Sequence, residues 1–117
     1  MTESDRLECL FCGIVAGDVK ADIVRQTERT VAFRDINPQA PTHVLVVPRE
    51  HHVDVGAMAA ADALLAGEVL RECAEVALDE GMEAYRVIFN TGSEAGQSVF
   101  HVHAHVLAGR SLTWPPG

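Results

Sequence analysis

Basic side chains are scarce in this sequence of 117 residues. Nine Lys and Arg residues stand against 17 Asp and Glu residues, which gives a formal net charge of −8. Binding to DNA or RNA gains free energy when Lys and Arg neutralise phosphates, so we expect no nucleic-acid partner. A single nucleotide remains a suitable ligand, because one site needs only a few local hydrogen-bond donors.

Cysteines and long apolar runs are also few. Three cysteines do not make the disulfide framework of a small secreted protein. No apolar run approaches the ~20 residues that span a bilayer, and the polar residues 1–8 lack the apolar segment of a signal peptide. We therefore expect a cytoplasmic protein that has no membrane partner.

The pattern of short apolar segments predicts one α+β domain over residues 1–117. Residues 1–8 are expected to form a loose tail and residues 108–117 an extended one. The β-branched and alternating segments predict five strands, at Ile23–Gln26, Val31–Asp35, Val44–Val47, Tyr85–Asn90 and Val99–Leu107.

Two segments have helical character. Cys9–Ala16 is expected to form a short helix that ends at Gly17, since glycine tolerates the left-handed conformation after a helix. One long helix is expected over residues 58–80, where the apolar residues of one face recur at three- and four-residue spacing: Leu65, Val69, Cys73 and Val76.

All six histidines fall in two short segments. His101, His103 and His105 alternate with apolar residues, so on a strand their rings share one face and the apolar residues share the other. The outer two are ~13 Å apart along a strand, which is too far for all three to hold one metal. Neutral imidazole is a nucleophile near pH 7, and the glycine-containing loop 92–98 suits phosphate oxygens. The pattern therefore favours phosphoryl transfer.

Longer motifs carry a family resemblance. Residues 96–107, Gly-Gln-Ser-Val-Phe-His-Val-His-Ala-His-Val-Leu, resemble the signature of the histidine-triad (HIT) nucleotide-binding family, in its Hint branch. Residues 35–43 and the C-terminal Trp-Pro-Pro-Gly are also similar to Hint proteins. The resemblance implies a single HIT-like domain. Its five-stranded antiparallel sheet would carry one main helix and a short N-terminal helix, and two subunits would form a homodimer.

The resemblance also implies the activity of a purine nucleoside 5′-phosphoramidate hydrolase that needs no catalytic cofactor. His103 would carry the nucleotidyl group covalently, and the carbonyl group of His101 would fix its tautomer. His105, His43 and Ser98 would support the phosphate. The nucleotide-binding residues would be Asp35 for the ribose; Phe11, Ile14, Phe33 and Ile36 for the purine; Asn90, Gln97 and Val99 for the phosphate; and Trp114 across the dimer.

Some of these residues have a purely structural alternative. Asp35 could serve only to cap the turn that follows it, and Ser98 and Asn90 are common turn residues. Trp114 could simply pack a chain terminus onto the core.

Cys9 and Cys12 form a C-x-x-C pair, which is half of a zinc site. In the bacterial proteins that the sequence resembles, two histidines complete it, here His51 and His101. The resulting Cys₂His₂ site would be structural, because it leaves no open position for a substrate. His52 competes with His51 as a ligand, and a pair of thiols that binds no metal is the alternative.

Three other functions stay open. A dinucleoside polyphosphate hydrolase is disfavoured by the Trp-Pro-Pro-Gly tail. A non-catalytic nucleotide-binding or zinc-stabilised adaptor would not need His103. A metal-dependent hydrolase would use His103 and His105 as ligands together with Glu94, the acidic residue of the preceding loop.

Overall fold

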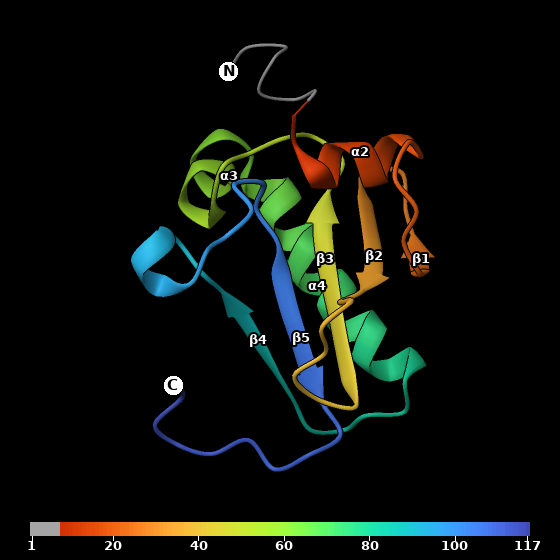
Figure 1. The fold of residues 1–117 in the computed structure, drawn as a ribbon, viewed down its shortest axis with the longest axis vertical. Coiled ribbons are helices and arrows are strands. Elements are labelled where there is room, and N and C mark those ends of the chain that lie inside the picture. The colour runs from red at the N-terminus through yellow and green to blue at the C-terminus, as the bar shows by residue number, and fades with distance from the viewer. Residues whose placement is uncertain (1–7) are drawn as a thin grey trace.

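The computed structural model describes residues 8–117, so the tail predicted for residues 1–8 lies outside them except for the exposed Glu8. The elements follow in the order α2 (Leu10–Ala16), β1 (Ile23–Gln26), β2 (Thr30–Arg34), β3 (Thr42–Pro48), α3 (Val55–Ala61), α4 (Ala63–Asp79), β4 (Tyr85–Phe89), the 3₁₀ turn η1 (Ser93–Ala95) and β5 (Ala104–Ala108). The strands form one antiparallel sheet in the order β1-β2-β3-β5-β4 (Figure 1). The predicted α+β fold is confirmed.

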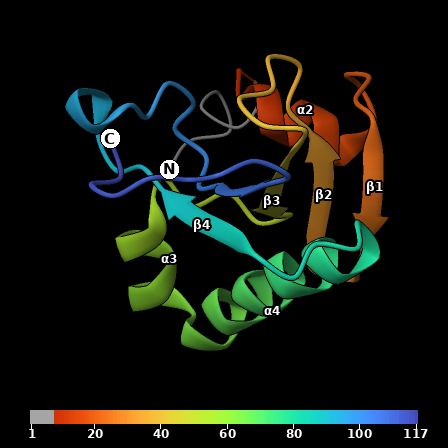
Figure 2. The same ribbon diagram turned by 90° about the horizontal axis from the view of Figure 1, so that it is seen from below.

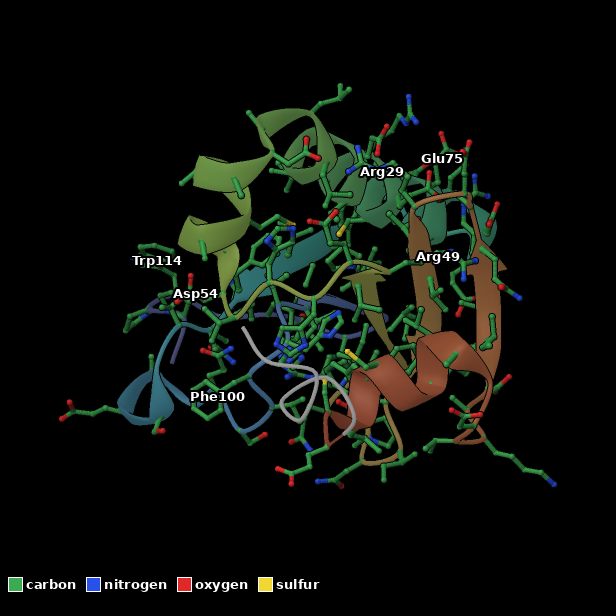
Figure 3. The ribbon with its side chains drawn as sticks, turned by 90° about the horizontal axis from the view of Figure 1, so that it is seen from above. Arg29, Arg49, Asp54, Glu75, Phe100 and Trp114 are labelled. Atoms are coloured by element: carbon green, nitrogen blue, oxygen red, sulfur yellow. The ribbon has the colours of Figure 1, made fainter. Side chains whose placement is uncertain are left out.

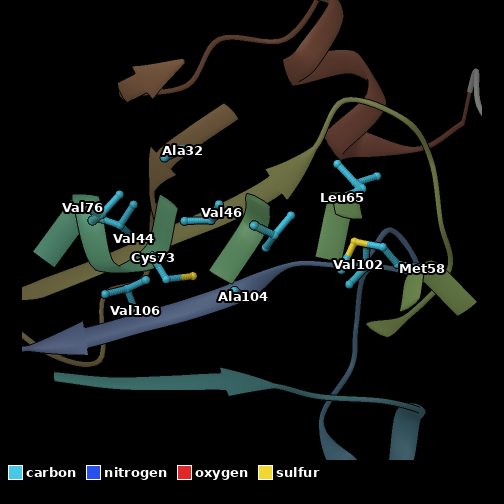
Figure 4. Packing of buried hydrophobic residues seen from close by; sticks show 11 residues of the cluster. Ala32, Val44, Val46, Met58, Leu65, Cys73, Val76, Val102, Ala104 and Val106 are labelled. Carbon is cyan, nitrogen blue, oxygen red and sulfur yellow. The ribbon is translucent and has the colours of Figure 1, made fainter. Parts of the chain in front are cut away.

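The two faces of the sheet carry two separate apolar clusters. Helices α3 and α4 lie on one side of the sheet and α2 lies on the other (Figure 2). Because side chains alternate along a strand, Val44 and Val46 of β3 pack toward α4, whereas Leu45 and Val47 pack toward α2. The α4 cluster also holds the apolar residues between the triad histidines, as predicted, and its labelled members include Val102, Ala104 and Val106 (Figure 4).

The short N-terminal helix forms where the sequence predicts it. Gly17 follows α2 with φ 84°, and its N–H group bonds back to the helix carbonyls. The side chain of Cys9 accepts the N–H of Cys12 at the other end of the helix. Cys9 is therefore held at the N-cap position by a bond within the C-x-x-C pair.

The single helix predicted over residues 58–80 is wrong, because the segment forms two helices. Asp62 separates them, with φ −156° and ψ 85°, and its carboxylate accepts the N–H of Leu65 and pairs with Arg29. The first helix begins earlier than predicted, after Asp54, whose side chain accepts the N–H of Ala57. None of the helices within residues 8–117 has the length and apolar character to cross a membrane.

The strand predicted over residues 99–107 is wrong in its first half, since β5 begins only at Ala104 and runs to Ala108. Its partner β3 ends at Pro48, which has no N–H to donate to a ladder. The N–H of Val102 donates instead to the carbonyl of His52 at 2.7 Å. His101 and His103 thus lie just beyond the sheet, where their rings can meet groups from other segments.

Candidate active site and metal cluster

His103 is held as a neutral base with a defined tautomer. Its Nδ1 lies 2.9 Å from the carbonyl oxygen of His101. A carbonyl oxygen only accepts, so Nδ1 carries the proton and Nε2 holds a lone pair. The residue is 8% exposed, and burial lowers the pKa of its imidazole, although the bond to His101 acts in the opposite direction. Nε2 is therefore available as a nucleophile at neutral pH.

A chain of hydrogen bonds sets the tautomers of two further histidines. The N–H of Gln39 donates to Nδ1 of His43 at 3.0 Å, so Nε2 of His43 carries the proton. That Nε2–H donates to Nδ1 of His105 at 2.9 Å. The proton of His105 therefore resides on Nε2, which is buried and has no hydrogen-bond partner among the described residues. Such an unsatisfied donor is costly unless a ligand oxygen accepts from it.

Burial also keeps His43 and His105 neutral. It lowers the pKa of His105 to about 4, with the neighbouring His103 and His43 adding to the effect. It lowers the pKa of His43 as well, against the opposing charge of Asp35. The two rings are 5.2 Å apart between centroids, and His105 is 4.9 Å from His103. His103 thus presents a lone pair on Nε2, and its neighbour His105 presents a hydrogen-bond donor on Nε2.

Asp35 caps the turn that follows it and also lies beside His43. One carboxylate oxygen accepts the N–H of Asn37 at 2.8 Å, which caps the following turn. The other lies 3.4 Å from Nε2 of His43. The side chain is 20% exposed, so it remains accessible to a hydroxyl-bearing ligand.

Three of the four residues predicted to contact a purine lie together. The ring of Phe11 stands edge-on to His103, with centroids 5.0 Å apart and an interplanar angle of 88°. Phe11 also contacts Phe33 at 5.4 Å, and Ile14 belongs to the same buried cluster. Ile36 is 99% exposed and lies outside this cluster.

The side chain of Gln97 holds the predicted phosphate loop together. Its Oε1 accepts the N–H of Gly92, and its Nε2 donates to the carbonyls of Val53 and Val99. Both amide hydrogens and one oxygen lone pair are therefore used within the protein. The resemblance implies a phosphate contact for Gln97 and did not predict this positioning role.

The remaining loop residues are less constrained. Ser98 is exposed and Asn90 is partly buried. Gly96 has φ 98° and lies beside the Asn90 side chain. This left-handed backbone favours glycine.

The structure brings the two cysteines together with His51 and His101. Nε2 of His101 donates to the carbonyl of Pro48 at 2.8 Å, so the lone pair on Nδ1 faces Cys9 Sγ at 3.4 Å and Cys12 Sγ at 3.5 Å. Nδ1 of His51 lies 3.2 Å from Cys12 Sγ. All four ligand atoms lie within 4.8 Å of one another.

This donor set fits a tetrahedral zinc ion. Ligands at the usual zinc distances stand about 3.5 Å apart in a tetrahedron, close to the sulfur–nitrogen distances found here. The bond from His101 to Pro48 is the outer hydrogen bond that orients a metal-binding imidazole. His52 lies outside the group, with Nε2 3.2 Å from Glu50.

A second group, Asp35, His43 and His105, also has the composition of a metal site. Its tautomers oppose that role, because the nitrogen of His43 that faces the group carries a proton fixed by Gln39. Within this group, Nε2–H of His105 is therefore arranged to donate to an anion. His103 and Glu94, which the metal-hydrolase alternative requires, belong to neither group found within residues 8–117.

Trp114 is 83% exposed, on the tail that follows β5. It lies at the periphery of the molecule, on the same side as Asp54 (Figure 3). The alternative in which it packs onto the core of its own chain is wrong.

Comparison with known proteins gives consistent matches. Residues 16–112 match the HIT domain family. A HIT-like protein of Synechocystis sp. is 40% identical over 111 residues, covering 94% of this chain and 97% of that protein. A 14 kDa zinc-binding protein of Zea mays is 40% identical over 111 residues, covering 92% and 87%. The crystal structure of a HIT family hydrolase from Legionella pneumophila Philadelphia 1 superposes with a TM-score of 0.90 at 42% identity, covering 94% and 100%.

Proposed function

This chain belongs to the HIT domain family, and from that premise we propose that it hydrolyses purine nucleoside 5′-phosphoramidates. The single observation that carries the proposal is the 2.9 Å bond from Nδ1–H of His103 to the carbonyl of His101. It directs the lone pair to Nε2 and fixes the orientation of the ring. A pure nucleotide-binding protein would not need a nucleophile held in this way.

The reaction has two steps. Nε2 of His103 attacks the α-phosphorus, the phosphorus–nitrogen bond to the amine breaks, and the departing nitrogen takes up a proton from solvent. Water then attacks phosphorus and gives a proton back to solvent, the bond to His103 breaks, and a nucleoside 5′-monophosphate is released. A covalent intermediate divides one difficult displacement into two easier ones.

The donors around His103 suit the charge that develops on phosphorus oxygens. The buried Nε2–H of His105 lacks a partner within residues 8–117 and would donate to one oxygen. The loop locked by Gln97 would supply the N–H of Val99 and the hydroxyl of Ser98. Preorganised donors of this kind stabilise transition states, because they need no rearrangement during the reaction.

The nucleoside would occupy the adjoining surface. The ring of Phe11 packs edge-on against the nucleophile, and it would form one wall for the base. Asp35, with one oxygen committed to Asn37, would accept hydroxyl protons of the ribose with the other. Ile36, which is exposed in the single chain, would cover the base from the opposite side.

We also infer that Cys9, Cys12, His51 and His101 hold a structural zinc ion. The fit of the four ligand atoms supports this, as does the name of the zinc-binding relative from Zea mays. The ion would tie α2 to the segments that carry His51 and His101. It supplies folding free energy and leaves the chemistry to the imidazoles.

A homodimer is the third part of the proposal. β4 is an edge strand, and a long unpaired edge is a template for another strand. Pairing of two β4 edges would produce a ten-stranded sheet. The exposed Trp114 would then have a partner surface within reach. Light scattering on the purified protein tests this directly, since a monomer at micromolar concentration contradicts it.

The activity is tested by comparing two substrates at equal concentration. We expect adenosine 5′-phosphoramidate with a fluorogenic amine to turn over at least 10²-fold faster than diadenosine tetraphosphate, by kcat/KM. The reverse preference would identify a dinucleoside polyphosphate hydrolase. Nucleotide binding without turnover of either substrate would identify a binding protein.

A further inference from the structure

We propose that Cys9 and Cys12 are a redox modification site for hydroperoxides, and that their conversion to a disulfide weakens nucleotide binding. The inference rests on the proposed nucleotide site. It concerns residues that the hydrolysis itself does not use. The two thiols and the nucleophile are connected by two short paths, one through Phe11 and one through His101.

The two thiols are close and accessible. Their sulfur atoms belong to a group of ligand atoms that lie within 4.8 Å of one another. Both residues are partly exposed, and Cys9 lines a cavity of about 730 Å³ together with His51 and Ser98. A small hydroperoxide can therefore reach the pair. Cys73, in contrast, is 1% exposed within the apolar core.

The reaction balances with one named oxidant. One thiolate attacks a peroxide oxygen, the O–O bond breaks, and a sulfenic acid and hydroxide form; the hydroxide takes up the proton released by the thiol to become water. The second thiolate attacks that sulfur, a disulfide forms, and hydroxide leaves to become water. Two thiols and one hydrogen peroxide thus give one disulfide and two waters. A metal ion held by the thiolates would lose these two ligands on oxidation and would leave as a hydrated cation.

Disulfide formation must move side chains at the start of α2. It brings the two sulfur atoms to about 2.05 Å, much closer than two unbonded sulfur atoms can lie, so Cys9 and Cys12 must approach each other. Cys9 lies outside the helix in extended conformation, with ψ 120°, so it can move toward Cys12. The bond from Cys12 N–H to Cys9 Sγ is then lost, and the first turn of α2 is distorted.

This distortion reaches the nucleophile through Phe11. Phe11 lies between the two cysteines in the sequence, and its ring touches both His103 and His101, with centroids 5.0 and 6.0 Å away. It is 5% exposed, and buried side chains transmit displacement because protein interiors are closely packed. A shift of the first turn of α2 therefore changes the proposed wall for the base.

The second path runs through His101. Its Nδ1 faces both sulfur atoms, while its carbonyl accepts a hydrogen bond from Nδ1–H of His103. Oxidation removes the two thiolates, which removes the metal and changes what the His101 ring contacts. The carbonyl that orients His103 belongs to the same residue, so the position of the nucleophile depends on the state of the thiols.

The test uses the full chain, reduced and then treated with hydrogen peroxide. Trypsin places Cys9 and Cys12 on residues 7–20 and Cys73 on residues 72–86, so peptide mass identifies the oxidised pair. AMP affinity is measured by calorimetry before treatment, after it, and after dithiothreitol. We expect loss of two hydrogens on residues 7–20, release of zinc, and an affinity at least fivefold weaker that dithiothreitol and zinc restore.

Two variants make the result specific. Cys12→Ser cannot form the disulfide, so peroxide should leave its affinity within twofold of its own untreated value. Cys73→Ala retains the pair and should respond as the wild type does. Complete disulfide formation with unchanged AMP affinity would overturn the proposal. Oxidation of Cys73 with Cys9 and Cys12 left reduced would also overturn it. Failure of the reduced protein to bind AMP would instead refute the proposed nucleotide site.

Discussion

Nε2 of His43 lies 2.9 Å from Nδ1 of His105, and this contact decides which nitrogen of His105 can donate. The proton on His43 is itself fixed by the N–H of Gln39. We therefore expect His43 to act on the phosphate through His105, as a positioning residue, although the resemblance grouped it with the residues that support the phosphate directly.

Replacement of His43 tests this relationship. His43→Ala should lower kcat about 10–100-fold with little change in KM, because His105 loses the partner that holds its proton on Nε2. His43→Gln keeps a side-chain N–H near Nδ1 of His105 and should recover part of the rate. Steady-state kinetics of both variants measure the effect, and equal losses in the two would argue against a positioning role.

Asp35 is predicted to recognise the ribose through the oxygen that does not bind Asn37. Asp35→Asn should raise KM for the ribonucleotide about 10-fold, and it should do so less for the 2′-deoxy substrate, which offers one hydroxyl fewer. Parallel kinetics with the two substrates give the comparison. A similar KM increase for both would assign Asp35 to the turn and to His43 only.

Stability should fall on the acid side of neutrality. Burial lowers the pKa of His105 to about 4, while the unfolded chain binds that proton near pH 6.5. The unfolded chain therefore binds more protons than the folded one below pH 6.5, and the free energy of unfolding decreases as the pH falls from 6.5 toward 4. Thermal melts should show Tm roughly 5 °C or more lower at pH 5 than at pH 7.5. His105→Asn should show a smaller decrease, and an equal one would contradict the role of this residue.

Removal of zinc should destabilise the fold without being required for the chemical step. A chelator should release about one metal ion per chain and lower Tm by roughly 10 °C. Cys9→Ser should bind the ion more weakly, whereas Cys73→Ala, outside the cluster, should retain full stoichiometry. Elemental analysis and melting curves provide the measurements. A chain that purifies without metal and melts identically with the chelator would contradict the site.

Local patterns in the sequence predicted the sheet well. Alternation in the histidine segment identified the apolar face of Val102, Ala104 and Val106 that packs with α4, and Gly17 marked the end of α2 correctly. These features depend on residues that are close in sequence, where periodicity and backbone preference act directly.

The features that the sequence did not reveal depend on distant partners. The Ala-rich run around Asp62 has high helix propensity, but Asp62 pairs with Arg29 and ends one helix there. His101 and His103 leave the sheet because Pro48 ends the neighbouring strand. The tautomer of His43 depends on a backbone N–H from a loop, which no side-chain pattern encodes.

The central claim is that His103 is the nucleophile. The most direct measurement compares wild type and His103→Ala on adenosine 5′-phosphoramidate with a fluorogenic amine, with mass spectrometry of the quenched wild-type reaction. We predict a fall in kcat of at least 10³-fold in the variant, with AMP binding retained, and a nucleotidyl adduct on His103 in the wild type. Turnover by the variant within 10-fold of wild type, or an adduct on another residue, would contradict the account.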